Sequence, residues 1–305
     1  MYEISKIPIC STSYPHRFTL IKSMACGLAL LASGQAMAGN QYSTGNVTDF
    51  TTAANWDDIA AGCPGTATAT VAPTVFDTFN ICDTHTITLG APATADWVSV
   101  KPGGTLALGA FALTATARLQ IDDEAIPGTP PAGTVTSSSA TTAHQLAFLN
   151  VGFGTPGATG PVANLGGAQI TGNVQLNSGT LTLGSNSSVG GDVIINADGT
   201  FAGTLRFTNT NHSIRANIAA KTIPNLDLSL MTTGRTITIV APGQNVTFTN
   251  VAGRSLECPV GTPYNGTAIT GGTICTVGAA VVTPSVSAPI FSTKEKPAVF
   301  SEEVK

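Results

Sequence analysis

Charged side chains are scarce in this sequence. Its 305 residues include 13 Lys and Arg and 17 Asp and Glu, or 10% charged residues against about 25% in an ordinary soluble domain. Aromatic residues make up only 6%, and helical periodicity is almost absent. The main apolar run, Met24 to Ala32, is far shorter than the roughly 20 residues of a membrane-spanning helix. The composition therefore argues against a membrane-spanning segment and predicts a soluble mature chain.

The N-terminus is typical of a secretory signal peptide. Lys6, Arg17 and Lys22 precede the apolar run, and Ala36-Met-Ala38 places small residues at the two positions that signal peptidase reads. We expect residues 1–38 to be a leader cleaved after Ala38, rather than a buried helix. The remaining chain has 10 Lys and Arg against 16 Asp and Glu, a net charge of −6. This acidic balance argues against a nucleic-acid partner.

Four cysteines remain after the expected cleavage: Cys63, Cys82, Cys258 and Cys275. An even number in an exported chain indicates disulfides, and three pairings are possible. We favour Cys63 with Cys82 and Cys258 with Cys275, because each pair is close in sequence and lies at one end of the β-rich region. A zinc site is disfavoured, since no CxxC motif occurs and no histidine lies at ligand spacing.

Short alternating runs broken by glycine or asparagine fill residues 39–282 and predict strands joined by turns. Val174–Leu183 aligns with 193–202, so that Val174 matches Val193 and, after a one-residue insertion in the turn, Thr180 matches Thr200. Val98–Leu108 has the same order of strand, turn and strand, and it precedes Val174 by four times the first offset. A period of about 20 residues predicts a parallel β-solenoid.

The repeat predicts an all-β, single-stranded parallel solenoid, expected to be a right-handed β-helix with disulfide-pinned ends. Roughly ten coils at about 4.8 Å each would make a rod on the order of 50 Å long. The alternative architecture is an antiparallel β-sandwich. Residues 124–143 are rich in Pro, Ser and Gly and are predicted to form a projecting loop, and residues 283–305 a flexible tail.

The early coils resemble exported bacterial β-solenoid surface proteins, the group with autotransporter-passenger-like and adhesin-like repeats. The residues that carry the resemblance are Asn55-Trp-Asp-Asp58, Phe76–Ile81, Thr86–Leu89, Val98 with Val100, and Gly103–Leu108. The resemblance implies that these segments cap a solenoid and open its first coils. It implies location at the cell exterior more than any chemistry.

Candidate catalytic residues are few. Asp122, Asp123 and Glu124 near Arg118 could serve a calcium-dependent polysaccharide lyase, but neighbouring residues on a strand point to opposite faces. We interpret the acids as a solvated turn and assign no catalytic, cofactor or metal residues. The histidines at 85, 144 and 212 are scattered, and we expect each to be exposed on a strand or turn.

Two further features bear on binding. Trp97 is a weak candidate for stacking on a sugar, whereas Trp56 is expected in the core or cap. Outward Thr-x-Thr units could order water and bind ice, but in the sequence they do not repeat in register over many coils, so ice binding is not favoured.

The sequence predicts a non-enzymatic, exported structural or adhesive protein without a cofactor. The expected partners are the chain itself, as an oligomer or filament built on coil ends, or surface glycans. The alternative is a carbohydrate-active enzyme of polysaccharide-lyase type, or a glycan-binding module, on a solenoid face.

Overall fold

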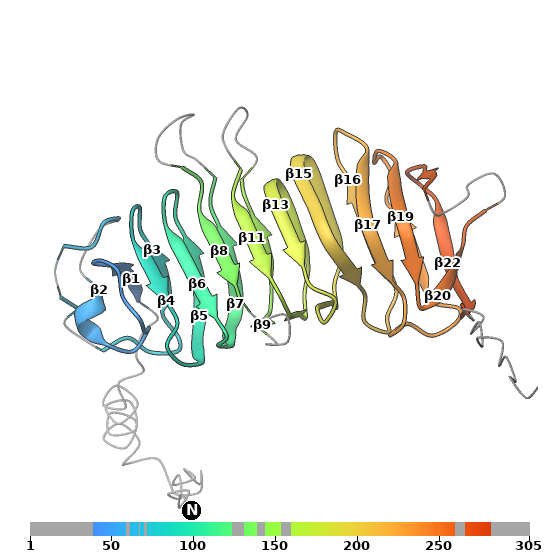
Figure 1. Cartoon of the computed structure of the whole chain (residues 1–305). Coiled ribbons are helices and arrows are strands. Elements are labelled where there is room, and N and C mark those ends of the chain that lie inside the picture. The colour runs from blue at the N-terminus through green and yellow to red at the C-terminus, as the bar shows by residue number, and fades with distance from the viewer. Residues whose placement is uncertain are drawn as a thin grey trace, which may run out of the picture.

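The computed structural model is an elongated solenoid of about seven turns (Figure 1). It describes residues 39–58, 62–66, 68–69, 72–123, 131–138, 144–153, 160–259 and 266–281. The predicted leader 1–38 and tail 283–305 lie outside these residues. Within them there is no α-helix, only the 3-10 turn η1 (Ala53–Asn55). The prediction of an all-β parallel solenoid is confirmed, and the sandwich alternative is wrong.

Three stacks of parallel strands enclose the core, and four long strands bend at a corner and contribute to two stacks each. The first stack, here named the amide face, consists of β1 (Asn40–Ser43), β3 (Thr78–Ile81), residues 97–100 of β5 (Ala93–Val100), 118–121 of β7 (Leu113–Ile121), β10 (Leu149–Val151), 174–176 of β13 (Val174–Leu183), 193–195 of β15 (Val193–Arg206), β16 (His212–Ala216) and β18 (Thr236–Ile239).

The second stack, the threonine face, consists of β4 (Thr86–Thr88), β6 (Thr105–Gly109), β8 (Thr134–Ser137), β11 (Val162–Leu165), the second part of β13 and residues 200–203 of β15. Residues 204–206 of β15 continue the stacking onto β17 (Lys221–Asp227) and β19 (Val246–Ala252). The third face contains the first parts of β5 and β7, then β9 (His144–Leu146), β12 (Ala168–Ile170) and β14 (Ser188–Val189).

The corners are sharp, and glycine makes some of them possible. Gly179 lies between the two parts of β13 and has φ of +74°, a conformation that other residues rarely adopt. A Cβ atom at this position would also meet the carbonyl oxygen of Pro161 in the neighbouring coil. The turn therefore requires glycine for its backbone angle and for its close packing.

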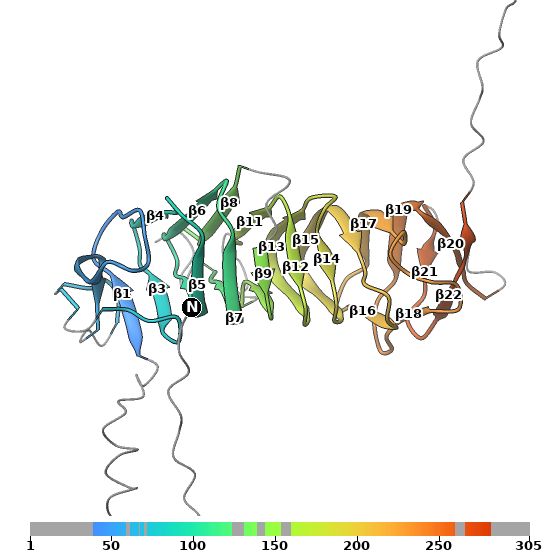
Figure 2. The same cartoon turned by 90° about the horizontal axis from the view of Figure 1, so that it is seen from below.

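Both ends of the solenoid carry antiparallel strands. At the N-terminal end β2 (Trp56–Asp57) pairs antiparallel with β1. At the C-terminal end β22 (Ile274–Ala280) pairs antiparallel with β18 and with β20 (Arg254–Glu257), and β21 (Ala268–Ile269) pairs antiparallel with β19. Figure 1 shows β1 and β2 at one end of the rod with β20 and β22 at the other, and Figure 2 shows β21 beside β20 and β22. They interrupt the parallel stacking at both ends.

The interior is a set of apolar columns, one residue per coil. One column contains Phe79, Val98, Leu119, Leu149, Val174, Val193 and Ile214, which are all nearly inaccessible to solvent. Each coil covers the apolar side chains of its neighbours, which is how a solenoid buries its core. The predicted alignment of 174–183 with 193–202 is confirmed as direct strand pairing, with a bulge where the extra residue enters the turn.

The predicted number of coils was too high. Val98 and Val174 do share a column, but only Leu119 and Leu149 lie between them, so three steps separate them rather than four. The stretch of chain from Leu119 to Leu149 is much longer than that from Val174 to Val193, although each spans one coil. Longer connections therefore give about seven turns instead of ten.

The predicted loop 124–143 contains a coil strand. Residues 134–137 form β8, which stacks between β6 and β11, so this strand belongs to the solenoid and not to a projection. The flanking segments 124–130 and 139–143 lie outside the described residues. The Pro- and Ser-rich composition of residues 124–143 gave no indication of so short a strand.

Candidate functional site

Both predicted disulfides are present, at opposite ends of the solenoid. Cys63 bonds to Cys82 next to β3, and Cys258 bonds to Cys275 between β20 and β22. At the same end, Trp56 packs against Phe50 and Phe79 with ring centres 5.4 and 4.8 Å away, and its side chain is fully buried. Trp56 therefore belongs to the core of the N-terminal cap, as the sequence predicts.

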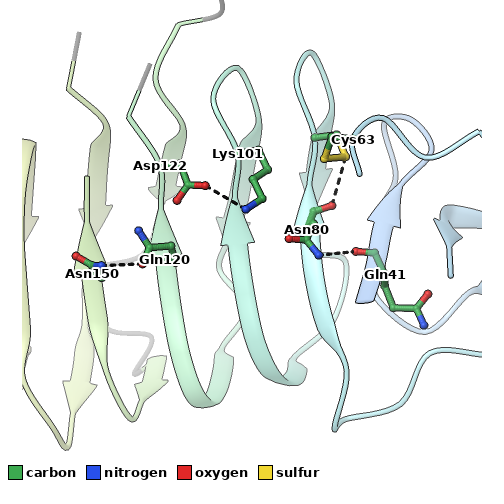
Figure 3. Close-up of polar contacts among 8 residues, drawn as sticks. Gln41, Cys63, Asn80, Lys101, Gln120, Asp122 and Asn150 are labelled. Atoms are coloured by element: carbon green, nitrogen blue, oxygen red, sulfur yellow. Dashed lines mark hydrogen bonds and ion pairs between the residues drawn. A yellow bond between two sulfur atoms is a disulfide. The ribbon is translucent and has the colours of Figure 1, made fainter. Parts of the chain in front are cut away.

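A pocket of about 410 Å³ opens beside the first disulfide. Its lining combines a phenol, an amide, a carboxylate and an ammonium group, and consists of Tyr42, Gly62, Cys63, Asn80, Asp83, Lys101 and Pro102. The Asn80 amide nitrogen donates to the carbonyl of Gln41 at 3.3 Å, and Lys101 forms a salt bridge of 3.2 Å with Asp122 (Figure 3). This pocket offers hydrogen-bonding groups and one aromatic ring to a small polar ligand.

A chain of side-chain amides runs across the outside of the amide face. Asn150 donates to Gln120 at 2.7 Å, Asn177 donates to Asn150 at 3.0 Å, and Asn196 in turn donates to Asn177. Asn217 completes the chain by donating to Asn196 at 2.7 Å. Asn150, Asn177 and Asn196 each donate to one neighbour and accept from the next, while Gln120 accepts at one end and Asn217 donates at the other, so the series links five coils. It ties the coils together and leaves few of these groups for a ligand.

The two acids that were interpreted as a solvated turn are buried, so that interpretation was wrong. Asp122 lies on the outer side beside Lys101, and burial raises its pKa although the Lys101 ammonium opposes the rise. Asp123 accepts hydrogen bonds from the Ser178 hydroxyl and, at 2.8 Å, from the Phe153 backbone N–H. Asp123 therefore joins three coils.

Two of the three histidines are buried rather than exposed, which corrects the prediction. His144 accepts a hydrogen bond at Nδ1 from the Leu113 backbone N–H at 3.2 Å, and burial lowers its pKa to about 4. His212 is stacked on Phe207 with ring centres 4.2 Å apart. His85 is partly exposed and its Nδ1 lies 2.8 Å from the Ser43 hydroxyl. Each histidine therefore contacts a neighbouring part of the solenoid through a hydrogen bond or ring stacking.

Trp97 lies at a corner of the amide face with a cation over its ring. The Arg118 guanidinium carbon is 4.8 Å from the Trp97 ring centre and 5.3 Å from that of Phe148. Trp97 and Arg118 are partners in neighbouring coils. A cation in this position is attracted by the ring face. Sugar stacking on that face of Trp97 would require Arg118 to move away, so stacking remains a prediction.

The most regular surface is the threonine face. Its outward side chains form two columns over six coils, and the first column is Thr86, Thr105, Thr134, Val162, Thr180 and Thr200. The second column is Thr88, Ala107, Thr136, Asn164, Thr182 and Ala202. All twelve side chains are exposed or half-exposed, none is charged, and eight are threonine.

The residues between the two columns point inward and fix the orientation of the threonines. They are Ile87, Leu106, Val135, Ala163, Leu181 and Phe201, and each is almost completely buried. Because successive side chains on a strand point to opposite faces, a buried central residue holds both of its neighbours outward. As the sequence predicts, complete Thr-x-Thr units do not repeat in every coil, since only residues 86–88, 134–136 and 180–182, in alternate coils, have threonine at both positions. The two columns nevertheless pair continuously through the sheet, although their spacing in the sequence is irregular.

No group of three or more metal-ligating side chains occurs among the described residues. Within the same part of the chain, no helix is long and apolar enough to cross a membrane. No protein-family model matches the chain, and searches of curated proteins and of solved structures found no match either. The candidate functional surfaces are therefore the faces of the solenoid and the pocket beside the first disulfide.

Proposed function

We propose that the protein is an exported, non-enzymatic adhesive protein of the cell exterior that holds its target against a side of the solenoid. The observation that carries this proposal is the threonine face, whose uncharged outward side chains extend over six coils. Such a surface provides many equivalent weak contacts over a wide area. It does not gather an acid, a base and a nucleophile at one point.

Export is supported by two independent features. Residues 1–38 have the charge, apolar run and small residues of a signal peptide. The two disulfides fit an oxidising compartment, where such bonds form and persist. The resemblance to adhesin-like solenoids is consistent with this location.

The structure of the ends favours contact through a side over filament growth through coil stacking. Antiparallel strands close both ends, and the outer strand β20 carries Arg254 and Glu257. Charged side chains on an edge strand oppose pairing with another chain. Self-association through the ends is thus the less favoured form of the proposal.

Adhesion can be tested with fluorescent beads that carry the oxidised protein recovered from an exporting host. We expect the beads to bind the producing cells or their extracellular matrix. The double variant Thr134→Tyr/Thr180→Tyr should reduce bead retention at least tenfold, because two large side chains would separate the face from its target. The matched variant Thr114→Tyr, on the third face, should stay within twofold. Absence of wild-type retention, or equal loss in both variants, would reject the proposal.

The pocket at the N-terminal cap supports a second candidate, a glycan-binding or carbohydrate-active site. Tyr42 could stack on a sugar while Asn80, Asp83 and Lys101 bind its hydroxyl groups. Glycan-array binding that is lost in Tyr42→Ala, with the threonine-face variants unaffected, would favour this function. Release of new sugar ends from a polysaccharide, dependent on calcium, would indicate the lyase.

A further inference from the structure

We infer that the threonine face binds ice. This inference names the target of the adhesive face proposed above and rests on that proposal, since an exported protein can meet extracellular ice. Three properties of the face carry it: the two-dimensional spacing of its side chains, the chemistry of those side chains, and the contrast with the other two faces.

The spacing of the two columns is set by β-geometry. Residues two apart on a strand are separated by about 6.6 Å, and neighbouring coils by about 4.8 Å. Thr134 and Thr136, for example, stack on Thr105 and Ala107 in the coil before them. The outward positions therefore repeat in two perpendicular directions, with threonine in five of the six coils of the first column and in alternate coils of the second. Oxygen atoms on surfaces of hexagonal ice repeat at similar intervals in two directions, so water held by this face can match the crystal.

The side chains suit ordered water. Threonine presents a hydroxyl group, which can bind a water molecule, and a methyl group, beside which water has restricted orientation. Its branched Cβ limits rotation about χ1, so few conformations are lost on binding. The first column is β-branched in all six coils because Val162 stands where the others have threonine. None of the twelve positions is charged, so no ionic hydration shell competes with this ordered water.

The other faces lack this combination. The amide face presents the linked asparagines together with Lys101, Asp122 and Arg118. The third face has the outward column Thr94, Thr114, Gln145, Gln169 and Ser188, in which Gln145 donates to Gln169 at 2.9 Å. Polysaccharide surfaces are usually bound by aromatic rings, and the threonine face has none among its twelve outward positions. Ice is therefore favoured over a glycan as its target.

The test is partition of the oxidised, exported protein into slowly growing ice, together with the shape of a single ice crystal held just below its melting point. We expect enrichment in the ice at least fivefold over an inert protein, and faceted crystals. The double variant Thr134→Tyr/Thr180→Tyr should return partition to the inert level and Thr114→Tyr should not. Thr180→Val, which copies Val162, should keep at least half of the enrichment.

Exclusion of the wild-type protein from ice would overturn the inference, as would equal loss in the double variant and Thr114→Tyr. If the wild type is excluded from ice but its beads still adhere to cells through the threonine face, the adhesive function stands and ice is the wrong target. Binding of a crystalline polysaccharide without binding of ice would lead to the same conclusion. Failure of both assays would reject the two proposals together.

Discussion

Replacing Asn177 by alanine should be among the most damaging changes on the outside of the solenoid. Its amide nitrogen donates to the Asn150 side chain at 3.0 Å and to the Gly152 carbonyl at 2.6 Å. Its oxygen accepts from Gln175 at 2.9 Å and from Asn196. The residue is only 6% exposed, so water cannot readily replace these bonds. Asn177→Ala would remove four hydrogen bonds at once.

The expected cost follows from which partners stay buried. Gln175 and Asn196 are half-buried and can turn toward water. Asn150 is 8% exposed, and its oxygen and the Gly152 carbonyl would lose a donor in a buried position. A buried polar group without a partner costs about 1–3 kcal/mol. We therefore expect Asn177→Ala to lower the free energy of unfolding by about 3 kcal/mol, a large part of the typical stability of a domain.

Urea unfolding followed by circular dichroism, with the disulfides intact, would measure this loss. Gln169→Ala is the matched control, because Gln169 also forms a cross-coil amide bond but is exposed, and its loss should cost about 0.5 kcal/mol or less. A double-mutant cycle of Asn177→Ala with Asn196→Ala should give a coupling of about 1 kcal/mol or more. If Asn177→Ala costs no more than Gln169→Ala, the linked amides do not hold the coils together.

Two further predictions concern a buried histidine and the C-terminal disulfide. His144 has a pKa of about 4 in the folded protein against about 6.5 in the unfolded chain. Between these pH values the folded state binds fewer protons than the unfolded state. The free energy of unfolding should therefore fall by about 3 kcal/mol as the pH drops from 6.5 to 4. Urea unfolding of His144→Gln should show a smaller loss of stability over that pH range. An unchanged pH dependence would mean that His144 does not cause the loss. Replacing Cys258 and Cys275 together by serine should cost about 3 kcal/mol, because the bond closes a 17-residue separation. Unfolding midpoints would check this, and an unchanged midpoint would show that the bond does not stabilise the C-terminal end.

The sequence predicts those features that depend on local pattern. Alternation gives the strands, the short offset between Val174 and Val193 gives the stacking, and the proximity of each cysteine pair gives the disulfides. These features need no knowledge of distant contacts. Trp56 was predicted as a core residue for the same reason, since its surroundings resemble a cap.

The features that were missed depend on the lengths of the connections between coils. Thr105 and Thr134 are direct partners in the sheet, yet they are farther apart in the sequence than Val174 and Val193 are. A search at one fixed period cannot align them, because the number of residues between stacked positions differs from coil to coil. Part of the signal was nonetheless present, since residues 86–88, 134–136 and 180–182 are Thr-x-Thr units with an apolar central residue. Aligning these units by that residue, without a fixed period, would have placed three of the six coils of the threonine face.

Burial of polar groups was also beyond the sequence. Nothing near Asp123 in the chain shows that Ser178, 55 residues away, would donate to it. The environment of His144 likewise depends on Leu113 in the preceding coil. From the sequence alone such side chains are expected to be exposed, because their hydrogen-bond partners lie on other coils.

The alignment of the threonines into one continuous face is the central claim, and cross-linking of paired cysteines tests it most directly. Thr105→Cys/Thr134→Cys would place two thiols at partner positions on neighbouring coils, whose strands lie about 4.8 Å apart. A short bifunctional thiol reagent should join them in the folded protein with its native disulfides intact, with the link located by peptide mass spectrometry. Thr94→Cys/Thr134→Cys, on different faces, should remain unlinked. Failure to join residues 105 and 134, or equal joining of the control pair, would contradict the aligned face.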